Sequence, residues 1–398
     1  MEAARAMAQG IENADHDAEV RCLPMADGGE GTARALVDAT GGSMRAVPVH
    51  DPLGRPVEGH FGLLADGTTA VVETAEASGL ALLEAKERNP LIASSYGTGE
   101  LMLAAVRSGA KRIIVGLGGS ATNDAGCGLL QALGVRLLDH DGRDVRPGGA
   151  ALAEVERVDL SGLDRRLGDV HVIAACDVTN PLTGPEGASA VFGPQKGASR
   201  EDVTLLDGAL RHVSSVIERA LAEQVPAERN GDGGKVEAAV AESSSPGHRS
   251  RPDHRTRTPI ADHPGAGAAG GIGMALLAVL HADFRPGIDL VIEQSGLDAA
   301  AQWADIVFTG EGSIDAQTMF GKTPVGVASV AKRHGKPVIA IAGHVGDGIE
   351  CLHGRGIDAV FGAAPGAASL DELLRDARAN VARTAEQVTR LMRIVRSH

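Results

Sequence analysis

DIVFTGEGSIDAQTMFGKTPVGVA, residues 305–328, is the stretch that decides the fold class of this chain. The apolar run at 306–308 predicts a buried strand, and the Gly-rich segment after it predicts a loop whose backbone can approach a ligand closely. Thr323 and Pro324 predict the start of a helix, with Thr323 as its N-cap and Gly335 just beyond its end. A strand, a polar loop and a helix N-terminus in this order are typical of an anion or phosphate site.

The alternation of strands and helices continues on both sides of this stretch. The C-terminal third predicts further βα units and a last helix that opens with the S-L-D-E capping box of Ser369 and Glu372. The N-terminus predicts a helix over 2–13, a strand over 19–24 and a helix over 31–39. Repeated units of this kind indicate a parallel sheet.

A block of different character interrupts this pattern. The runs at 44–49, 56–64 and 68–73 predict antiparallel strands, with a hairpin turn at Asp66-Gly67 between the last two. Mixed helices and strands follow, so we expect a second domain inserted into the first. Residues 224–263 are rich in Pro, Gly, Ser and Arg and predict a mobile, solvated insertion, with a basic patch at 248–257 as a weaker alternative.

The length, charge and cysteine content limit the classes of function that this chain can have. A length of 398 residues predicts about two domains, and a net charge of −14 argues against a nucleic acid or an anionic membrane as partner. The four cysteines are far apart and form no C-x-x-C pair, which indicates neither a zinc site nor a disulfide framework. No apolar run reaches membrane-spanning length. We therefore expect a cytoplasmic protein with small-molecule partners, and leave homo-oligomerisation open.

The first candidate loop is PMADGGEGT at residues 24–32. Its glycines allow backbone N–H groups to face a ligand, while Asp27 can bind a hydroxyl group or a metal-bound water. The alternative is a plain Gly-rich turn in which Glu30 interacts with the dipole of the next helix. Adjacent acids and glycines favour function, and the binding candidates are Asp27, Gly28, Gly29 and Glu30.

The second loop, VGLGGSATNDAG at residues 115–126, follows a predicted strand and precedes a helix. Gly116, Gly118 and Ala121 match the dinucleotide fingerprint, and Asp139 lies at about the expected distance, which leaves an NAD-dependent oxidoreductase open. The polar side chains equally suit the phosphates of ATP or a hydroxy acid. The binding candidates here are Gly118, Gly119, Ser120, Thr122, Asn123 and Asp124.

Two further loops complete the set. In residues 176–198, Asp177 and Asn180 follow a buried strand and are placed for a binding site, and Lys196 either meets an anionic group or is an exposed turn lysine. In the opening stretch, residues 316–323 resemble a Walker A motif, but Ala316 replaces its first glycine and the strand ends too early, so we reject a P-loop. The candidates in that stretch are Gly310, Glu311, Gly312, Asp315 and Lys322.

Together these loops resemble the bacterial glycerate kinase family, whose members phosphorylate D-glycerate with ATP. The resemblance rests on PMADGGEGT, VGLGGSATNDAGCG, ACDVTNPLTGPEGA, FGPQKGA, GAGAAGG and TGEGSIDAQTMFGKTPVGVA, in this order along the chain. It implies an α/β fold of two domains, a discontinuous flavodoxin-like parallel-sheet domain with a mixed α/β domain inserted in it. We expect the first domain over 1–48 and 285–398 and the second over 49–284.

The resemblance also implies a reaction, the ATP-dependent phosphorylation of D-glycerate, with 2-phosphoglycerate favoured as product and ATP and Mg²⁺ required. We expect Asp177 and Asp315 to serve as catalytic base or as Mg²⁺ ligand, the latter directly or through water, and Lys322 to neutralise phosphate charge. A protein that binds these ligands without turnover is the non-enzymatic alternative.

Relatives in this family begin with a strand and a D-S-F-K-G segment ahead of the first helix, whereas this sequence begins at Met1, within that helix. A missing strand would leave backbone groups of its neighbours unpaired. We therefore expect either a start further upstream or a truncated, weakly active protein.

Overall fold

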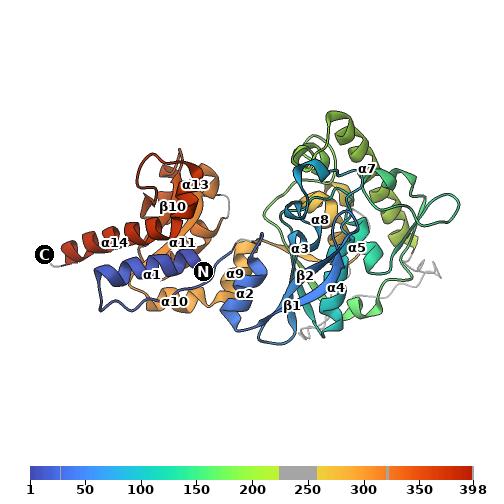
Figure 1. The fold of residues 1–398 in the computed structure, drawn as a ribbon. Coiled ribbons are helices and arrows are strands. Elements are labelled where there is room, and N and C mark those ends of the chain that lie inside the picture. The colour runs from blue at the N-terminus through green and yellow to red at the C-terminus, as the bar shows by residue number, and fades with distance from the viewer. Residues whose placement is uncertain (27, 224–257, 320–321, 397–398) are drawn as a thin grey trace, which may run out of the picture.

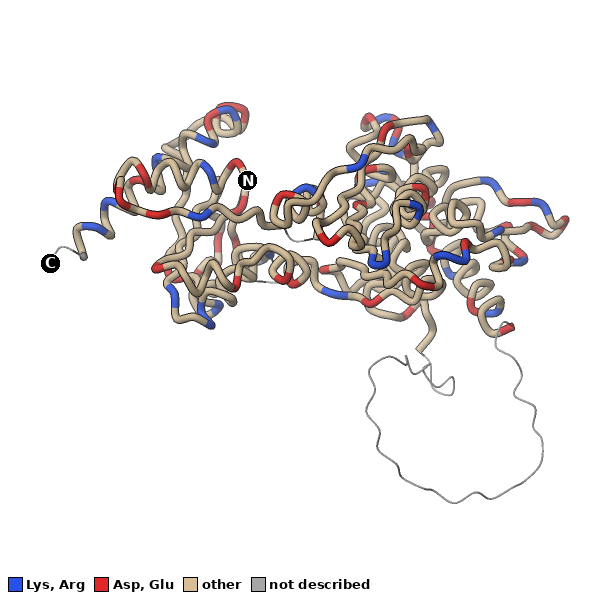
Figure 2. Tube along the Cα trace, turned by 90° about the horizontal axis from the view of Figure 1, so that it is seen from below, with Lys and Arg blue, Asp and Glu red and all other residues tan. Residues whose placement is uncertain are grey.

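The chain folds into two lobes, each built around its own β-sheet (Figure 1). The computed structural model describes residues 1–26, 28–223, 258–319 and 322–396. The larger lobe holds a six-stranded sheet of order β1-β2-β3-β4-β7-β8, and the smaller lobe a three-stranded sheet of order β11-β10-β9. Acidic and basic residues are interspersed over both lobes (Figure 2). The predicted α/β fold with two domains is confirmed.

The six-stranded sheet combines an antiparallel half with a parallel half. Its strands are β1 (Ser43–His50), β2 (Pro56–Leu63), β3 (Thr69–Glu73), β4 (Arg112–Gly116), β7 (His171–Ala175) and β8 (Asp283–Arg285). The pairs β1–β2 and β2–β3 are antiparallel, whereas β3, β4, β7 and β8 run parallel. Asp66 Oδ1 accepts hydrogen bonds from the backbone N–H groups of Thr68 and Thr69. These bonds hold the predicted hairpin turn, which is confirmed together with its strands.

Successive residues of the central strands pack against different helix layers. Ile113 and Val115 face a large apolar cluster, whereas Ile114 faces a smaller one on the opposite side, because side chains alternate across a strand. The helices of this lobe are α2 (Thr32–Thr40), α3 (Thr74–Ser78), α4 (Tyr96–Arg107), α5 (Cys127–Ala132), α6 (Ala188–Phe192), α7 (Arg200–Glu223), α8 (Ala268–Ala278) and α9 (Gly287–Ser295). Among the helices in the described part of the chain, α2 and α9 are the ones that contribute to the smaller cluster. Both faces are covered, which explains why the parallel strands read as continuous apolar runs.

Short elements complete the larger lobe. They are the hairpin strands β5 (Arg136–Leu138) and β6 (Arg157–Asp159) and the 3₁₀ helices η1 (Leu80–Leu82), η2 (Ala85–Glu87), η3 (Ala150–Glu154), η4 (Arg165–Asp169), η5 (Pro194–Lys196) and η7 (Ile260–Asp262).

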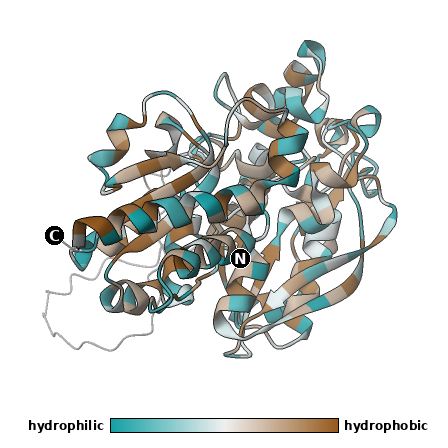
Figure 3. Ribbon diagram, turned by 60° about the vertical axis from the view of Figure 1, so that its left-hand side comes forward, coloured by the Kyte–Doolittle hydropathy of each residue, from teal (hydrophilic) through white to brown (hydrophobic). Residues whose placement is uncertain are grey.

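The smaller lobe is a parallel sheet with helices on both faces. Its elements are α1 (Glu2–Ala14), α10 (Leu297–Trp303), β9 (Val307–Ile314), η8 (Ala316–Met319), α11 (Thr323–Arg333), β10 (Val338–Val345), α12 (Glu350–His353), β11 (Ala359–Gly362), α13 (Leu370–Arg375) and α14 (Ala377–Arg396). On β10, Ala340 faces α11 and α12, whereas Ile339 and Ile341 face α1 and α14. The surface helix α14 shows alternating hydrophilic and hydrophobic patches (Figure 3).

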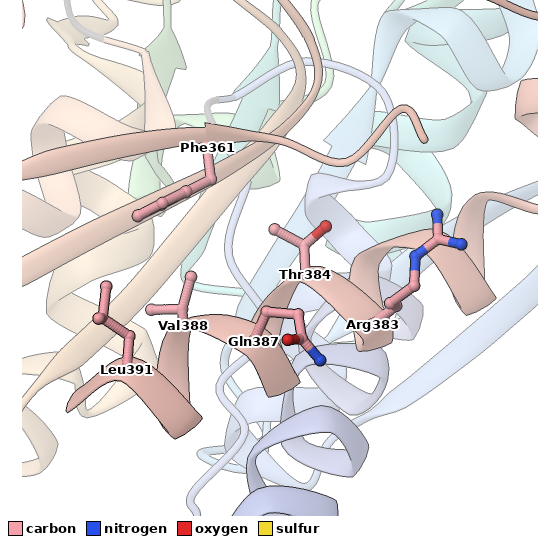
Figure 4. A pocket seen from close by; sticks show the side chains of 6 residues that line it. All are labelled: Phe361, Arg383, Thr384, Gln387, Val388 and Leu391. Atoms are coloured by element: carbon pink, nitrogen blue, oxygen red, sulfur yellow. The ribbon is translucent and has the colours of Figure 1, made fainter. Parts of the chain in front are cut away.

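Two cavities lie in this lobe. One, of about 280 Å³, lies between Phe361 of β11 and α14, where Val388 and Leu391 line it (Figure 4). The other, of about 840 Å³, is lined by residues of α1, α10, β9 and residues 17–23. Within the described residues no helix combines the length and apolar character needed to cross a membrane.

Three predicted elements need correction. The strand at 306–308 continues through the expected loop to Ile314, because β10 pairs with it as far as Val345. Residues 19–24 form no strand, because this segment has no strand partner among the described residues. The cavity of about 840 Å³ is lined by both this segment and β9. The predicted last helix divides at Asp376 into α13 and α14, although the Ser369 capping box is confirmed. In addition, Lys322 and not Thr323 is the N-cap of α11.

The sheets also bear on the expected domain limits. The expected boundary at residue 48 falls inside β1. Helix α9 lies beyond the expected boundary at residue 285, yet it packs on the six-stranded sheet. We therefore propose limits for the larger lobe near residues 26 and 296. Residues 224–257 of the predicted insertion lie outside the described residues, but 258–263 are folded, because Ile260 donates its N–H to Glu218 Oε1.

Candidate active site

The carboxyl ends of the four parallel strands of the larger lobe lie in one row. Glu73 pairs in register with Gly116, Gly116 with Ala175, and Ala175 with Arg285. In open α/β sheets, ligands bind in the crevice outside this edge. The candidate loops that follow β4 and β7 are therefore brought together, as their positions after buried strands predicted.

The loop of residues 24–32 crosses the same edge. A Cβ added to Gly28 would lie 2.8 Å from Gly287 Cα and 3.3 Å from Ala175 Cβ, and one added to Gly116 would lie 2.7 Å from the Gly28 oxygen. Gly28 also has a φ of +94°, which favours glycine. Glycine at these positions lets two backbone segments touch. Glu30 is exposed here, and Asp27 lies outside the described residues.

Glu73 anchors this loop and was missed by sequence reasoning. Its carboxylate accepts hydrogen bonds from Gly31 N–H at 2.9 Å and from Ala33 N–H at 2.6 Å, at the N-terminus of α2. The side chain is buried, and burial raises its pKa against the opposing effect of these two bonds. The sequence feature that could have identified Glu73 is an acidic residue at the end of an apolar strand, TAVVE at residues 69–73.

Only some of the candidate binding residues in the loop of residues 115–126 are accessible at the surface. Gly119 is exposed and Gly118 half-buried, whereas Ser120, Thr122 and Asn123 are buried. Asn123 Nδ2 donates to Ser189 Oγ, while its Oδ1 and Thr122 Oγ1 are buried without a hydrogen-bond partner among the described residues. Direct contact with a ligand therefore stays a prediction best supported for the Gly118–Gly119 turn.

Asp124, the last candidate of this loop, is directed into the protein. Its carboxylate accepts hydrogen bonds from Ser95 N–H and Oγ and from the N–H groups of Gly126 and Gly128. Burial raises its pKa, and these hydrogen bonds oppose the shift. Asp124 thus holds the start of α5 against α4.

The loop does not have the geometry of a dinucleotide site. The ten residues 117–126 separate the end of β4 from the start of α5, whereas the fingerprint needs a tight strand-to-helix turn. Asp139 lies in a turn after β5, where its Oδ1 accepts hydrogen bonds from the N–H groups of Asp141 and Arg143. The alternative of an NAD-dependent oxidoreductase loses its support.

Asp177 lies at the centre of the row. It is exposed, directly follows β7 and Cys176, and accepts a hydrogen bond through Oδ1 from Gly287 N–H at 3.0 Å, at the N-terminus of α9. Asn180 instead serves a turn, because its Nδ2 donates to the Glu186 oxygen at 2.8 Å. Of these two candidates, the structure brings Asp177 to the other loops.

The candidates of the smaller lobe gather between β9 and α11. Gly310, Glu311 and Gly312 lie on β9, and Asp315 directly follows it. Glu311 Oε1 accepts a hydrogen bond from Thr318 Oγ1 at 2.7 Å and lies 3.8 Å from Lys322 Nζ. The half-exposed Lys322 precedes α11, so its cation lies near a helix N-terminus suited to an anion.

Helix α9 connects the two groups of candidates. Gly326, in the first turn of α11, lies so close to Ile288 that a Cβ would collide with it. The preceding residue, Gly287, contacts both Gly28 and Asp177. The first turns of α9 and α11 therefore place Lys322 and the row of strand ends on neighbouring parts of the molecule.

The carboxylates fit a magnesium site of a particular kind. In the described part of the chain, no three His, Cys, Asp or Glu side chains gather into a metal-binding group. Mg²⁺ in phosphoryl-transfer sites is commonly held by one or two carboxylates together with substrate phosphates. Asp177 and Asp315, each at the end of a parallel strand, fit that arrangement.

Comparisons with known proteins show the family of this chain. The model of the Glycerate kinase family matches residues 1–393. A glycerate kinase of Bacillus subtilis (strain 168) is 44% identical over 397 residues, covering 100% of this chain and 95% of the relative. A glycerate 2-kinase of Escherichia coli (strain K12) is 43% identical over 393 residues, covering 99% and 94%.

A solved structure shows the same fold. The crystal structure of putative glycerate kinase 2 from Salmonella typhimurium LT2 is similar with a TM-score of 0.81 and 43% identity, covering 100% of this chain and 95% of that one. Since the family match and these relatives span nearly the whole sequence, the chain belongs to the glycerate kinase family and is a kinase.

Proposed function

We propose that this chain transfers the γ-phosphoryl group of ATP to the C2 hydroxyl group of D-glycerate. The observation that carries the proposal is the row Glu73, Gly116, Ala175 and Arg285, which sets Asp177 beside Gly28 and the N-terminus of α9. Such an edge offers backbone N–H groups to anionic substrates and one exposed carboxylate to a hydroxyl group. The name of the Escherichia coli relative, a glycerate 2-kinase, supports 2-phosphoglycerate as product.

Asp177 is our candidate for the base. Its carboxylate would orient the C2 hydroxyl group of D-glycerate and take its proton as the oxygen forms a bond to the γ-phosphorus. The bond from the γ-phosphorus to the β,γ-bridging oxygen breaks, and ADP leaves with that electron pair. The hydrogen bond from Gly287 N–H holds the carboxylate in place.

Asp315 and Lys322 are our candidates for the nucleotide side. Lys322 would neutralise phosphate charge at the start of α11, and Glu311, 3.8 Å from its Nζ, would keep that side chain near the helix when ATP is absent. Asp315 would hold Mg²⁺ together with the substrate phosphates. Mg²⁺, when bound, supplies charge neutralisation on the phosphoryl group. On the side of the larger lobe, Gly29 and Gly118 are half-buried, and a Cβ added to Gly118 would lie 3.2 Å from Gly29 Cα.

The test is an ADP-release assay with D-glycerate, ATP and Mg²⁺, with the product identified by ³¹P NMR. We expect ADP release that depends on all three and a phosphorus signal of 2-phosphoglycerate. A 3-phosphoglycerate signal would overturn the assignment of carbon 2 alone. Absence of ADP release with D-glycerate, when other hydroxy acids are phosphorylated, would overturn the substrate.

A further inference from the structure

Lys196 is a buried lysine behind the Gly118–Gly119 turn. It ends η5 and is only 2% exposed. Its Nζ donates hydrogen bonds to Ser120 Oγ at 2.9 Å and to the Thr122 oxygen at 2.7 Å. Neither of the roles expected from sequence, direct contact with an anion or an exposed turn lysine, describes this position.

Lys196 holds the turn together with a second buried side chain, that of Thr74. On the side of β4, Thr74 Oγ1 lies 3.0 Å from the Gly116 oxygen and 2.7 Å from the Gly118 oxygen. On the other side, Lys196 Nζ donates hydrogen bonds to Ser120 Oγ and to the backbone oxygen of Thr122. The exposed part of the loop is therefore fixed at both ends by buried donors.

Among the described residues the ammonium group has no carboxylate at contact distance, and both of its hydrogen-bond acceptors there are neutral oxygens. Asp124 attracts it, but that carboxylate already accepts hydrogen bonds from the backbone and hydroxyl of Ser95. Burial lowers the pKa of Lys196 to about 7, and Asp124 opposes the shift.

Such a group is costly for folding. An ammonium without a carboxylate partner destabilises the folded state when it is buried, and an apolar side chain of similar length would not carry that penalty. A positive charge in a poorly screened interior acts strongly on nearby anions. The burial of Lys196 directly behind the candidate binding turn therefore points to a role in binding or catalysis.

We propose that Lys196 is a positioning residue for phosphoryl transfer, which holds the Gly118–Gly119 turn from behind and supplies positive potential to an anionic substrate group bound there. This inference rests on the proposed function. The anionic group is either the carboxylate of D-glycerate or a phosphate of ATP, which share negatively charged oxygen acceptors. Lys196 acts through the loop and does not itself touch substrate.

The proposal makes activity and stability respond to pH in opposite directions. Unfolded lysine titrates near pH 10.4, whereas burial brings the folded pKa to about 7. Between these values the unfolded state binds more protons than the folded state, so the Lys196 contribution to stability rises with pH. Over the same range Lys196 loses its charge, so kcat/KM falls. A purely structural lysine would show the rise in stability without the fall in kcat/KM.

The experiment compares wild type with Lys196→Met, Lys196→Gln and the control Lys86→Met, whose lysine is 80% exposed. The readouts are kcat, KM for each substrate and Tm between pH 6 and 9. At pH 6 we expect both Lys196 variants to lose at least about tenfold in kcat/KM, since removal of one preorganised donor costs roughly 100-fold or more in known sites. We also expect the wild-type fall in kcat/KM above pH 7 to be absent from both.

The possible results separate the proposal from its alternatives. A wild-type pH profile retained in Lys196→Met, or full activity of Lys196→Gln, overturns the proposal while the proposed function stands. A rise in KM confined to D-glycerate assigns the turn to its carboxylate, and one confined to ATP assigns it to phosphate. If wild type does not turn over D-glycerate, the proposed function fails. Calorimetric binding of ADP and of D-glycerate then decides for Lys196, since equal affinity of wild type and Lys196→Met for both ligands overturns its role.

Discussion

The two groups of candidate residues are built in different ways. At the carboxyl edge of the six-stranded sheet, the backbone is held by buried charged side chains, with Glu73 4% and Lys196 2% exposed. Between β9 and α11, the side chains of Glu311 and Lys322 are 18% and 39% exposed, and their nitrogen and oxygen lie 3.8 Å apart. The first region is preorganised before any ligand arrives, whereas the second keeps charged side chains that a ligand can reorder.

This difference predicts where substitutions act. Changes in the larger lobe remove groups that are already in their working positions, so they lower kcat. Changes between β9 and α11 weaken the binding of a charged ligand and act mainly on KM. The following substitutions test this contrast, beginning with the largest expected effect.

Asp177→Asn is expected to lower kcat by roughly 100- to 10,000-fold, the range for loss of a general base. The fold should be retained, because the amide oxygen can still accept the hydrogen bond from Gly287 N–H. Steady-state kinetics and a thermal melt check this. Asp141→Asn, in the exposed turn after β5, is the control and should keep full activity. A kcat within threefold of wild type would remove Asp177 from the chemistry.

Glu73→Gln is expected to lower kcat/KM by about 10- to 100-fold. Its amide can present only one oxygen to the N–H groups of Gly31 and Ala33, and an unsatisfied buried group costs about 1–3 kcal/mol. Kinetics at pH 7.5 measure the loss.

The same variant gives a stability signature. Because burial raises the folded pKa of Glu73 above that of an ordinary glutamate, the folded state holds the proton more tightly, and this contribution to stability is lost as pH rises through the folded pKa. Glu73→Gln should lack that loss in melts recorded between pH 4 and 8. An unchanged pH dependence of Tm would contradict the assignment.

Gly28→Ala tests the close contact between the 24–32 loop and α9. At a φ of +94° an alanine is strained, and its Cβ would also lie 2.8 Å from Gly287 Cα. Gly54→Ala is the matched control, since its φ is +79° and nothing lies within 4 Å of the added Cβ. Both variants should lose about 1–3 kcal/mol of stability from strain, but only Gly28→Ala should also lose activity. Equal kinetics in the two variants would show that the contact is unimportant for the site.

Lys322→Gln should have the smallest effect, a rise in KM for ATP of about three- to tenfold with kcat little changed, because a half-exposed cation contributes only about 1 kcal/mol. Adding salt should narrow the difference from wild type. Lys86→Gln, with its side chain 80% exposed, is the control. If kcat falls more than KM rises, the β9–α11 region is as preorganised as the sheet edge and the contrast fails.

The sequence predicted much of this fold because its local signals agree. Alternating apolar residues and the Asp66-Gly67 turn were sufficient for the antiparallel strands, and Pro324 and Ser369 marked helix starts. The strand predicted at 19–24 was wrong because a strand needs a partner, and partners are decided by the rest of the fold. The expected loop after Phe308 was wrong for the converse reason, since pairing with β10 keeps a Gly-rich segment extended.

Within the candidate site, sequence identified the residue types but not their directions. It grouped Gly118, Thr122 and Asp124 as ligand contacts, yet Thr122 and Asp124 are buried, and the Asp124 carboxylate accepts hydrogen bonds from the protein itself. Glu73 was missed, and the role of Lys196 in holding a glycine-rich loop could not be predicted from spacing, since their partners are 42 and 76 residues away.

The sequence by itself thus determined the family, the α/β class and the set of glycine-rich loops, since these depend on local order along the chain. Only the tertiary structure decided that the ends of β3, β4, β7 and β8 form one row, and that α9 connects this row to α11. It alone showed that a buried carboxylate and a buried ammonium hold the loops. The reason is that burial, which raises the pKa of Glu73 and lowers that of Lys196, is a property of packing between distant segments.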